Sequence, residues 1–283
     1  KLLIDNNDYL DDYDRWVVLK LAARGKQQND GVFNLEATYS RTRKSGRIQE
    51  SFGYQGISGR IRRWCSYKFY LDLDQVNSFL SITLQYAERL GVSSACPVLK
   101  ANVETRAEVF QQIILSAAGS GVTLDKALIK RAFLITLHNG QFEALNDDDD
   151  GVSFRRKGSK PPKVTQKQLT ALRKDPTLSA FRKEIKTICE ALRKAYPDRW
   201  KEVLAAQDKH NKDGTFMSWM CQDAEYEITH AATQFLEKCG RKVDANVYDG
   251  MMVQLMFDVP EGCTDPSEAT PRPLPPFDEI SAY

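Results

Sequence analysis

The segment "ANVYDGMMV" (245–253) constrains the fold most, because it places Asp249 and Gly250 between two runs of strand-forming residues. An Asp-Gly pair in this setting is the strongest short-range signal for a two-residue β-hairpin, since both residues tolerate positive φ. The segment therefore predicts an antiparallel hairpin. Asp249 has two interpretations: it serves the turn alone, or it supplies a carboxylate for chemistry at the hairpin tip.

A second strand is predicted over "SYKFYLDLDQ" (66–75), where apolar and polar residues alternate. Asp72 and Asp74 share one face of this strand, so two carboxylates emerge together near its end. The next segment predicts a helix that stops at Gly91, because its apolar residues recur at helical spacing: Val76, Leu80, Leu84, Ala87 and Leu90.

The rest of the chain is mostly helical in pattern. A Thr123 N-cap is expected to open a helix that ends at Asn139-Gly140, and Gly240 is expected to end another. Further segments are predicted as helices at 9–25, 104–118, 166–193, 198–208 and 215–239, a strand at 31–42, an exposed loop at 141–165, and a Pro-rich tail after 258. Helical segments around a few strands indicate the α+β class.

Composition is that of an ordinary globular protein: 283 residues, 42% hydrophobic, 28% charged and a net charge of +2. The chain has no apolar run of roughly 18 residues, and its first residues are too acidic for a secretion signal. We therefore expect an intracellular protein, cytoplasmic or nuclear, with no membrane partner. Because the chain opens with Lys1 rather than Met, we also expect it to be a piece of something longer.

Cysteine and histidine spacing does not indicate a zinc site. The six cysteines lack C-x-x-C spacing, and the three histidines never pair with them at zinc-finger intervals. We expect reduced thiols, many of them buried. Basic runs near 41–47, 60–63 and 155–163 are typical of solvated faces, although they also suit a nucleic-acid partner.

Three predicted elements carry residues for one kind of chemistry. Asp72 ends a strand, Asp249 lies at a hairpin, and Lys126 and Lys130 lie one turn apart on a helix. Two carboxylates on adjacent strands can hold a pair of Mg²⁺ ions, for which Mn²⁺ can substitute, while lysines hold a triphosphate. This arrangement suits nucleotidyl transfer.

The same residues carry a family resemblance. The segment "YKFYLDLDQVNSFLSITLQYAERLG" (67–91), with the lead-in "GISGRIRRW", resembles motif A of the transposon-and-virus polymerase branch related to superfamily A DNA polymerases and single-subunit phage RNA polymerases. "LDKALIKRAFLITLHNG" (124–140) resembles motif B. "CQDAEYEITHAATQFLEKCGRKVDANVYDGMMV" (221–253) resembles the helix and hairpin of motif C. The three motifs occur in the order of the family.

The resemblance implies a right-hand polymerase-like core, with a small antiparallel palm sheet and a mostly helical fingers region. It divides the chain into an N-terminal lead-in (1–66), a first palm part (67–94), a fingers-like region (95–214), a second palm part (215–258) and a tail (259–283). It makes Asp72 and Asp249 the metal-binding carboxylates and Lys130 the phosphate and leaving-group residue. Lys126 becomes a second triphosphate contact, and Arg131 a rival to Lys130. Nucleic acid would be contacted by Arg60, Arg62 and Arg63.

Several of these residues also have structural interpretations. Asn77 contacts the nucleotide or caps the helix that follows it, and Asp74 assists the site or caps that helix. Lys126 and Lys130 could simply solvate a helix face, although Phe133 and Leu137 continue that face. His138 and His230 are interpreted as structural or surface groups, and Gln222 and Glu225 as hydrogen-bonding or packing residues.

Two departures from the family pattern bear on sugar choice. Phe79-Leu80 replaces the expected His-Pro, and His138-Asn139 replaces a residue that is often Tyr. The implied function is DNA-dependent DNA synthesis on a primed template from nucleoside triphosphates, in replication of a virus or mobile element, with partner domains of a longer polyprotein or replication complex. The alternatives are an RNA-synthesising polymerase or primase, an inactive nucleic-acid-binding domain of the same fold, and an unrelated helical interaction protein.

Overall fold

The computed structural model describes 70–146, 163–206, 209–247, 250–255 and several short segments. The short segments are 15–16, 19–20, 23, 26–27, 33–34, 38–40, 49–51, 62, 257–258 and 270–271. The chain divides into two compact units, which we call the sheet unit (1–75 and 225–283) and the helical unit (76–224).

The part of the chain that the structure describes is mostly helical and contains a small antiparallel sheet, so the expected α+β class is confirmed. Its helices are α4 (Ser78–Arg89), α5 (Pro97–Glu104), α6 (Arg106–Gly119), α7 (Lys126–Leu137), α8 (Gln166–Lys174), α9 (Pro176–Ala195), α10 (Pro197–Ala205) and α11 (Lys212–Lys238), with 3₁₀ turns η3 (Ser93–Ala95) and η4 (Phe142–Leu145). Its strands are β1 (Lys26–Gln27), β2 (Phe33–Asn34), β3 (Thr38–Ser40), β4 (Gln49–Ser51), β5 (Tyr70–Asp74), β6 (Val243–Val247), β7 (Gly250–Gln254), β8 (Phe257–Asp258) and β9 (Thr270–Pro271).

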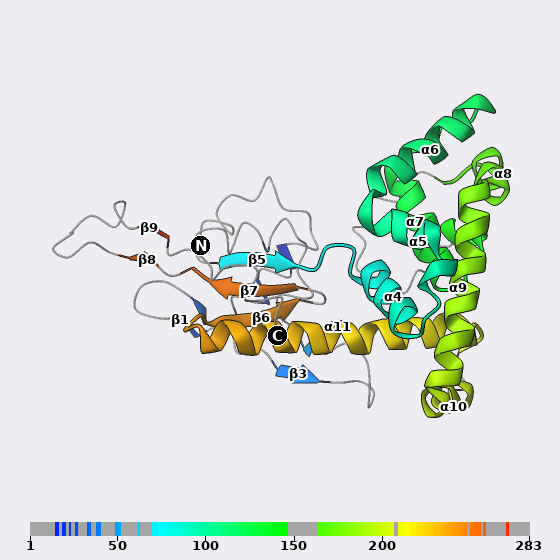
Figure 1. Ribbon diagram of the computed structural model, residues 1–283. Coiled ribbons are helices and arrows are strands. Elements are labelled where there is room, and N and C mark those ends of the chain that lie inside the picture. The colour runs from blue at the N-terminus through cyan, green and yellow to red at the C-terminus, as the bar shows by residue number, and fades with distance from the viewer. Residues whose placement is uncertain are drawn as a thin grey trace. The chain divides into compact units, whose positions relative to one another are not determined.

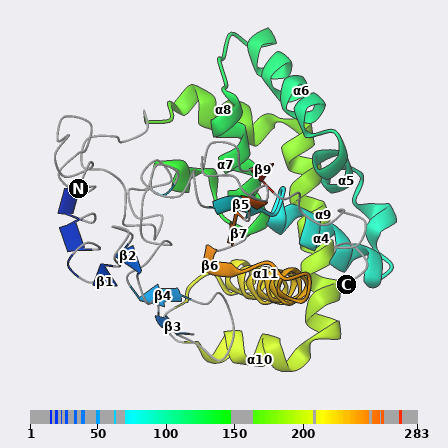
Figure 2. The same ribbon diagram turned by 90° about the vertical axis from the view of Figure 1, so that its left-hand side faces the viewer.

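The sheet unit is built on three antiparallel strands in the order β5-β7-β6, with the C-terminal part of α11 along one face (Figures 1 and 2). Phe235 and Leu236 of α11 pack against Met251 and Val253 of β7, and Leu73 of β5 joins them. Residues two apart on a strand point to the same face, so this packing also fixes which residues lie on the opposite face.

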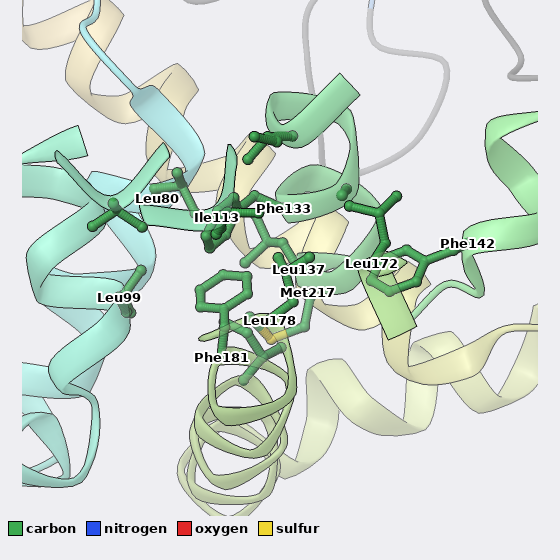
Figure 3. Close-up of a cluster of buried hydrophobic side chains, with 14 of the residues drawn as sticks. Leu80, Leu99, Ile113, Phe133, Leu137, Phe142, Leu172, Leu178, Phe181 and Met217 are labelled. Atoms are coloured by element: carbon green, nitrogen blue, oxygen red, sulfur yellow. The ribbon is translucent and has the colours of Figure 1, made fainter. Parts of the chain in front are cut away.

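The helical unit has its core around α7 and α9 (Figure 3). Phe133 of α7 lies between two other rings: it stacks on Phe110 with centroids 5.7 Å apart and meets Phe181 edge-on at 4.8 Å. Leu80, Leu84 and Ala87 of α4 join this core, which groups α4 with the helical unit. The division between the two units falls after residue 75, between β5 and α4.

Two helix starts differ from the sequence prediction. Thr123 is not the N-cap of α7, because the Asp125 carboxylate accepts the Leu128 N–H and opens the helix two residues later. The helix predicted over 166–193 is divided at Pro176, which lacks an N–H and forces Asp175 into an extended conformation. Asp175 then caps α9 by accepting the Leu178 N–H at 3.0 Å.

The chain turns sharply between β5 and α4. Asn77 is left-handed, with φ of 53°, and forms the N-cap of α4 without a side-chain capping bond. Val76 therefore lies before the helix and is 84% exposed, so its inclusion in the apolar helix face was wrong. Capping by Asp74 was also wrong, because Asp74 ends β5 three residues before the N-cap.

The end of α7 is held by the start of α11. Asn139 is left-handed, and the backbone bonds from Gly140 to Ile135 and from Asn139 to Thr136 form a Schellman motif. The Asn211 amide donates to the His138 carbonyl at 2.8 Å, and its Oδ1 accepts the Gly214 N–H at 2.9 Å. One side chain therefore satisfies the end of one helix and the start of the next.

Two features of the described residues bear on the remaining composition arguments. No described helix combines the length and the apolarity needed to cross a membrane. The four cysteines that the structure describes are free thiols, as expected: Cys96, Cys189 and Cys221 are buried, and Cys239 is exposed.

Glu184 of α9 caps α5 from a distance. Glu184 is 5% exposed, and its carboxylate accepts the N–H groups of Val98 (2.9 Å) and Leu99 (2.8 Å) at the first turn of α5. No side-chain cap is present at Cys96, so Glu184 satisfies two N–H groups that a helix start leaves without partners. Burial raises the pKa of Glu184, and the two N–H groups only partly offset this effect.

We expect Glu184→Gln to lower the free energy of unfolding by about 1–3 kcal/mol, because its NH₂ group would face a buried N–H. A raised folded-state pKa means that the contribution of the carboxyl group to stability is complete below its ordinary value of 4.5 and is lost as pH rises through the folded value. The difference in free energy of unfolding between wild type and Glu184→Gln should therefore shrink from acidic toward neutral pH. Urea denaturation across this range measures it.

The matched control is Glu190→Gln, an exposed position on the same helix, where we expect a change within about 0.5 kcal/mol. A difference between wild type and Glu184→Gln that widens as the pH rises would contradict the sign of the argument.

Candidate active site

β5 presents two carboxylates on the face of the sheet opposite α11. Asp72 and Asp74 are exposed, with the Asp72 side chain at 55%, while Leu73 between them packs toward α11. The alternation predicted from the sequence is therefore confirmed over Tyr70–Asp74. Residues 67–69 lie outside the described residues.

β7 places the predicted hairpin directly beside this acidic strand. Asp72 pairs with Met252 and Asp74 with Gly250, while β6 pairs with the other edge of β7. The expected hairpin is therefore confirmed, and its neighbour in the sheet is the strand that carries the other predicted carboxylate (Figure 1). Asp249 itself lies outside the described residues.

The register changes the role of Gly250. Val247 pairs with Gly250, so Gly250 already belongs to β7 and not to the loop that joins the two strands. The expectation that Asp249 and Gly250 form the centre of the turn was therefore wrong for Gly250, which is not among the described glycines with positive φ. A Cβ on Gly250 would lie 2.5 Å from the Leu73 carbonyl oxygen and 3.3 Å from Asp74 Oδ1. Glycine is needed there for the close approach of β5.

The same register places Asp74 close to the hairpin loop. It lies opposite Gly250, the residue that follows Asp249, whereas Asp72 lies two residues further from the hairpin loop. The sequence left Asp74 between a capping role and an assisting role. Asp74 is therefore the β5 carboxylate nearer to the hairpin loop.

Arg62 is the described member of the predicted nucleic-acid contacts. Its Nε lies 4.0 Å from Asp72 Oδ2, and its side chain is 19% exposed. This separation is an ion pair without a close hydrogen bond. A guanidinium next to Asp72 provides positive charge beside the exposed carboxylates. Arg60 and Arg63 lie outside the described residues.

The lysines predicted for phosphate binding lie on the first turns of α7. Lys126 and Lys130 are exposed, and within the described stretches neither ammonium group lies within 4.0 Å of a carboxylate. Phe133 and Leu137 on the following turns are buried, so the face of α7 that carries the two lysines changes from exposed to buried along the helix. Arg131, the rival to Lys130, donates to the Leu145 carbonyl at 2.8 Å and is engaged in holding η4.

Asn77 has a partner that the sequence did not indicate. Arg106 at the start of α6 donates to Asn77 Oδ1, and its guanidinium lies 5.0 Å from the centre of the Phe110 ring. The capping interpretation of Asn77 therefore holds for its backbone position and not for its side chain. Burial lowers the pKa of Arg106.

Phe79 and His138, which differ from the pattern of the family that the sequence resembles, are in contact. The rings of Phe79 and His138 lie edge-to-face with centroids 5.6 Å apart, within the helical unit. Substitution at one position therefore bears directly on the other. His138 has this structural contact, as expected, and the His230 ring stacks on Tyr226 at the surface of α11.

The remaining helix residues agree with packing and hydrogen-bonding roles. Gln222 donates to Ser218 Oγ at 2.9 Å, and Glu225 is 1% exposed.

The predicted site residues belong to two units. Asp72 and Asp74 are in the sheet unit, whereas Lys126, Lys130 and Asn77 are in the helical unit. Within the part of the chain that the structure describes, no group of three or more His, Cys, Asp or Glu side chains is placed to hold a metal ion.

Comparison of the chain with protein-family models, curated proteins and solved structures finds no match.

Proposed function

We propose that the chain is a template-directed nucleotidyltransferase, a DNA-dependent DNA polymerase with a right-hand core. The observation that carries the proposal is the pairing of β5 with β7, which puts an exposed acidic strand beside the hairpin that contains Asp249. In this proposal β5, β7 and β6 form the palm sheet, and helices of the helical unit form the fingers.

The acids fit divalent cations. Asp72 and Asp74 are exposed carboxylates on one face of a strand, and Mg²⁺ prefers oxygen ligands of this kind while it keeps several waters. In the proposal Asp72 and Asp249 hold two Mg²⁺ ions, and Mn²⁺ can substitute. Bound there, the ions would assist ionisation of a primer 3′-hydroxyl and stabilise the departing pyrophosphate.

The basic residues supply the anion contacts. Lys130 and Lys126 bind the triphosphate, and Lys130 is preferred to Arg131 because the Arg131 guanidinium is already bonded to Leu145. Arg60, Arg62 and Arg63 contact template or primer phosphates without reading sequence.

The test is primer extension on a primed DNA template with Mg²⁺, with deoxynucleotides and ribonucleotides supplied in separate reactions. Extension with deoxynucleotides is expected. Extension only with ribonucleotides would favour the RNA-synthesising alternative, and a reaction without primer tests initiation. Binding to the primed template without extension in either pool would favour the inactive nucleic-acid-binding alternative and overturn the proposal.

Lys130→Ala is expected to lower kcat about 100-fold, because removal of one preorganised donor to a developing charge costs on that order. Arg131→Ala should instead lower the free energy of unfolding and leave kcat of the folded fraction near wild type. Single-turnover extension and urea denaturation measure the two effects. Lys183→Ala, an exposed lysine on α9, is the control. Loss of kcat in Arg131→Ala alone would reassign the phosphate contact.

A further inference from the structure

Gln75 ties the end of the acidic strand to α11. Its side-chain amide donates to Thr229 Oγ1 at 2.9 Å and lies 3.4 Å from the Glu225 carbonyl oxygen. Thr229 is 4% exposed, and its hydroxyl donates to the same Glu225 carbonyl at 2.8 Å. The three residues all belong to the sheet unit.

This tie matters because β5 lies at the edge of the three-stranded sheet. Among the described strands it pairs with β7, and the side chains of Asp72 and Asp74 are exposed to solvent. Gln75 is the residue directly after Asp74. Its bond to α11 therefore anchors the chain at the residue next to Asp74.

α11 also holds the hairpin strand. Phe235 and Leu236 pack on Met251 and Val253 of β7, two turns along the helix from Thr229. β5 and β7 are thus both attached to α11, β5 by a polar bond and β7 by apolar contacts. Groups that bind a metal together must be held within about 0.5 Å of their working geometry.

We propose that Gln75 is a positioning residue for the carboxylates of β5, acting through Thr229. The proposal rests on the nucleotidyl-transfer function proposed above. Loss of either side chain removes the bond between Gln75 and Thr229 and frees the end of β5 from α11, while the carboxylates themselves remain.

The test compares wild type with Gln75→Met, which keeps the length of the side chain and removes the amide, and with Thr229→Val, which keeps its shape and removes the hydroxyl. We expect kcat for primer extension to fall about 10- to 100-fold, as for other residues that orient metal ligands, with a higher Mg²⁺ concentration at half-maximal rate and an unchanged KM for nucleotide. Thr229→Ser should recover most of the loss.

Thr233→Val is the matched control, because it removes a hydroxyl of the same helix that donates one turn back, to the Thr229 carbonyl at 2.9 Å. An equal loss of kcat in this variant, or wild-type kcat in Gln75→Met and Thr229→Val, would overturn the positioning role.

Hydrogen exchange separates this proposal from the proposed function. Amides of 70–75 should exchange faster in Gln75→Met, whereas those of 243–247 should not change. If the wild-type chain extends no primer, the proposed function is overturned. The exchange experiment still tests whether Gln75 holds β5 in place, and unchanged exchange at 70–75 in Gln75→Met would overturn that role.

Discussion

Primer extension by the Asp249→Asn variant is expected to fall at least about 1000-fold below that of the wild-type chain. An amide carries no net charge and binds Mg²⁺ more weakly than a carboxylate, so one of the two ligands of the proposed metal pair is lost. Asn suits tight turns as Asp does, so the hairpin should form in the variant. Single-turnover extension, with circular dichroism to verify folding, measures the effect.

The sheet register extends this prediction to variants of Asp72 and Asp74. Asp72→Asn should lower the rate of extension as much as Asp249→Asn does. Asp74→Asn should lower it less, and should raise the Mg²⁺ concentration at half-maximal rate less than Asp72→Asn does. Asp198→Asn is the control, because its side chain is 90% exposed on α10 and belongs to the helical unit. Extension that survives Asp249→Asn would overturn the site assignment even if the chain is a polymerase.

The sheet was predictable because its signals are local. Alternation over Tyr70–Asp74 and the turn residues near 248–250 each depend on neighbours within a few positions, and both elements formed as predicted. Pairing of β5 with β7 followed from the chemistry expected of Asp72 and Asp249. The exact turn did not follow, because the place of Gly250 is set by its close approach to Leu73, a contact between distant segments.

The support around the candidate site could not be predicted for the same reason. Arg106 on Asn77 and Gln75 on Thr229 join residues far apart in sequence, and neither pair has a spacing that marks it. The division at Pro176 is different in kind, because its signal is local: an Asp-Pro pair after a helical run marks a boundary. Sequence therefore located the candidate acids, while the contacts that hold them required the structure.

Gly214→Ala is expected to lower the free energy of unfolding by about 3 kcal/mol, the upper range for overpacking of a rigid site. Gly214 lies in the first turn of α11, where an added Cβ would collide with the backbone carbonyl of His138 and lie 2.5 Å from Asn211 Nδ2. The His138 carbonyl cannot move freely, because it ends α7 and also accepts the Asn211 amide. Thermal and urea denaturation measure the loss.

The matched control is Gly119→Ala, the same change at the last residue of α6. An added Cβ there meets nothing within 4 Å, and Ala is favoured over Gly in a helix by about 0.5–1 kcal/mol, so this variant should be as stable as wild type or more stable. Opposite signs for one substitution in two helices would show that the cost at Gly214 comes from the junction of α7 with α11. Equal changes in the free energy of unfolding at the two glycines would contradict this explanation, because helix propensity alone would then account for both.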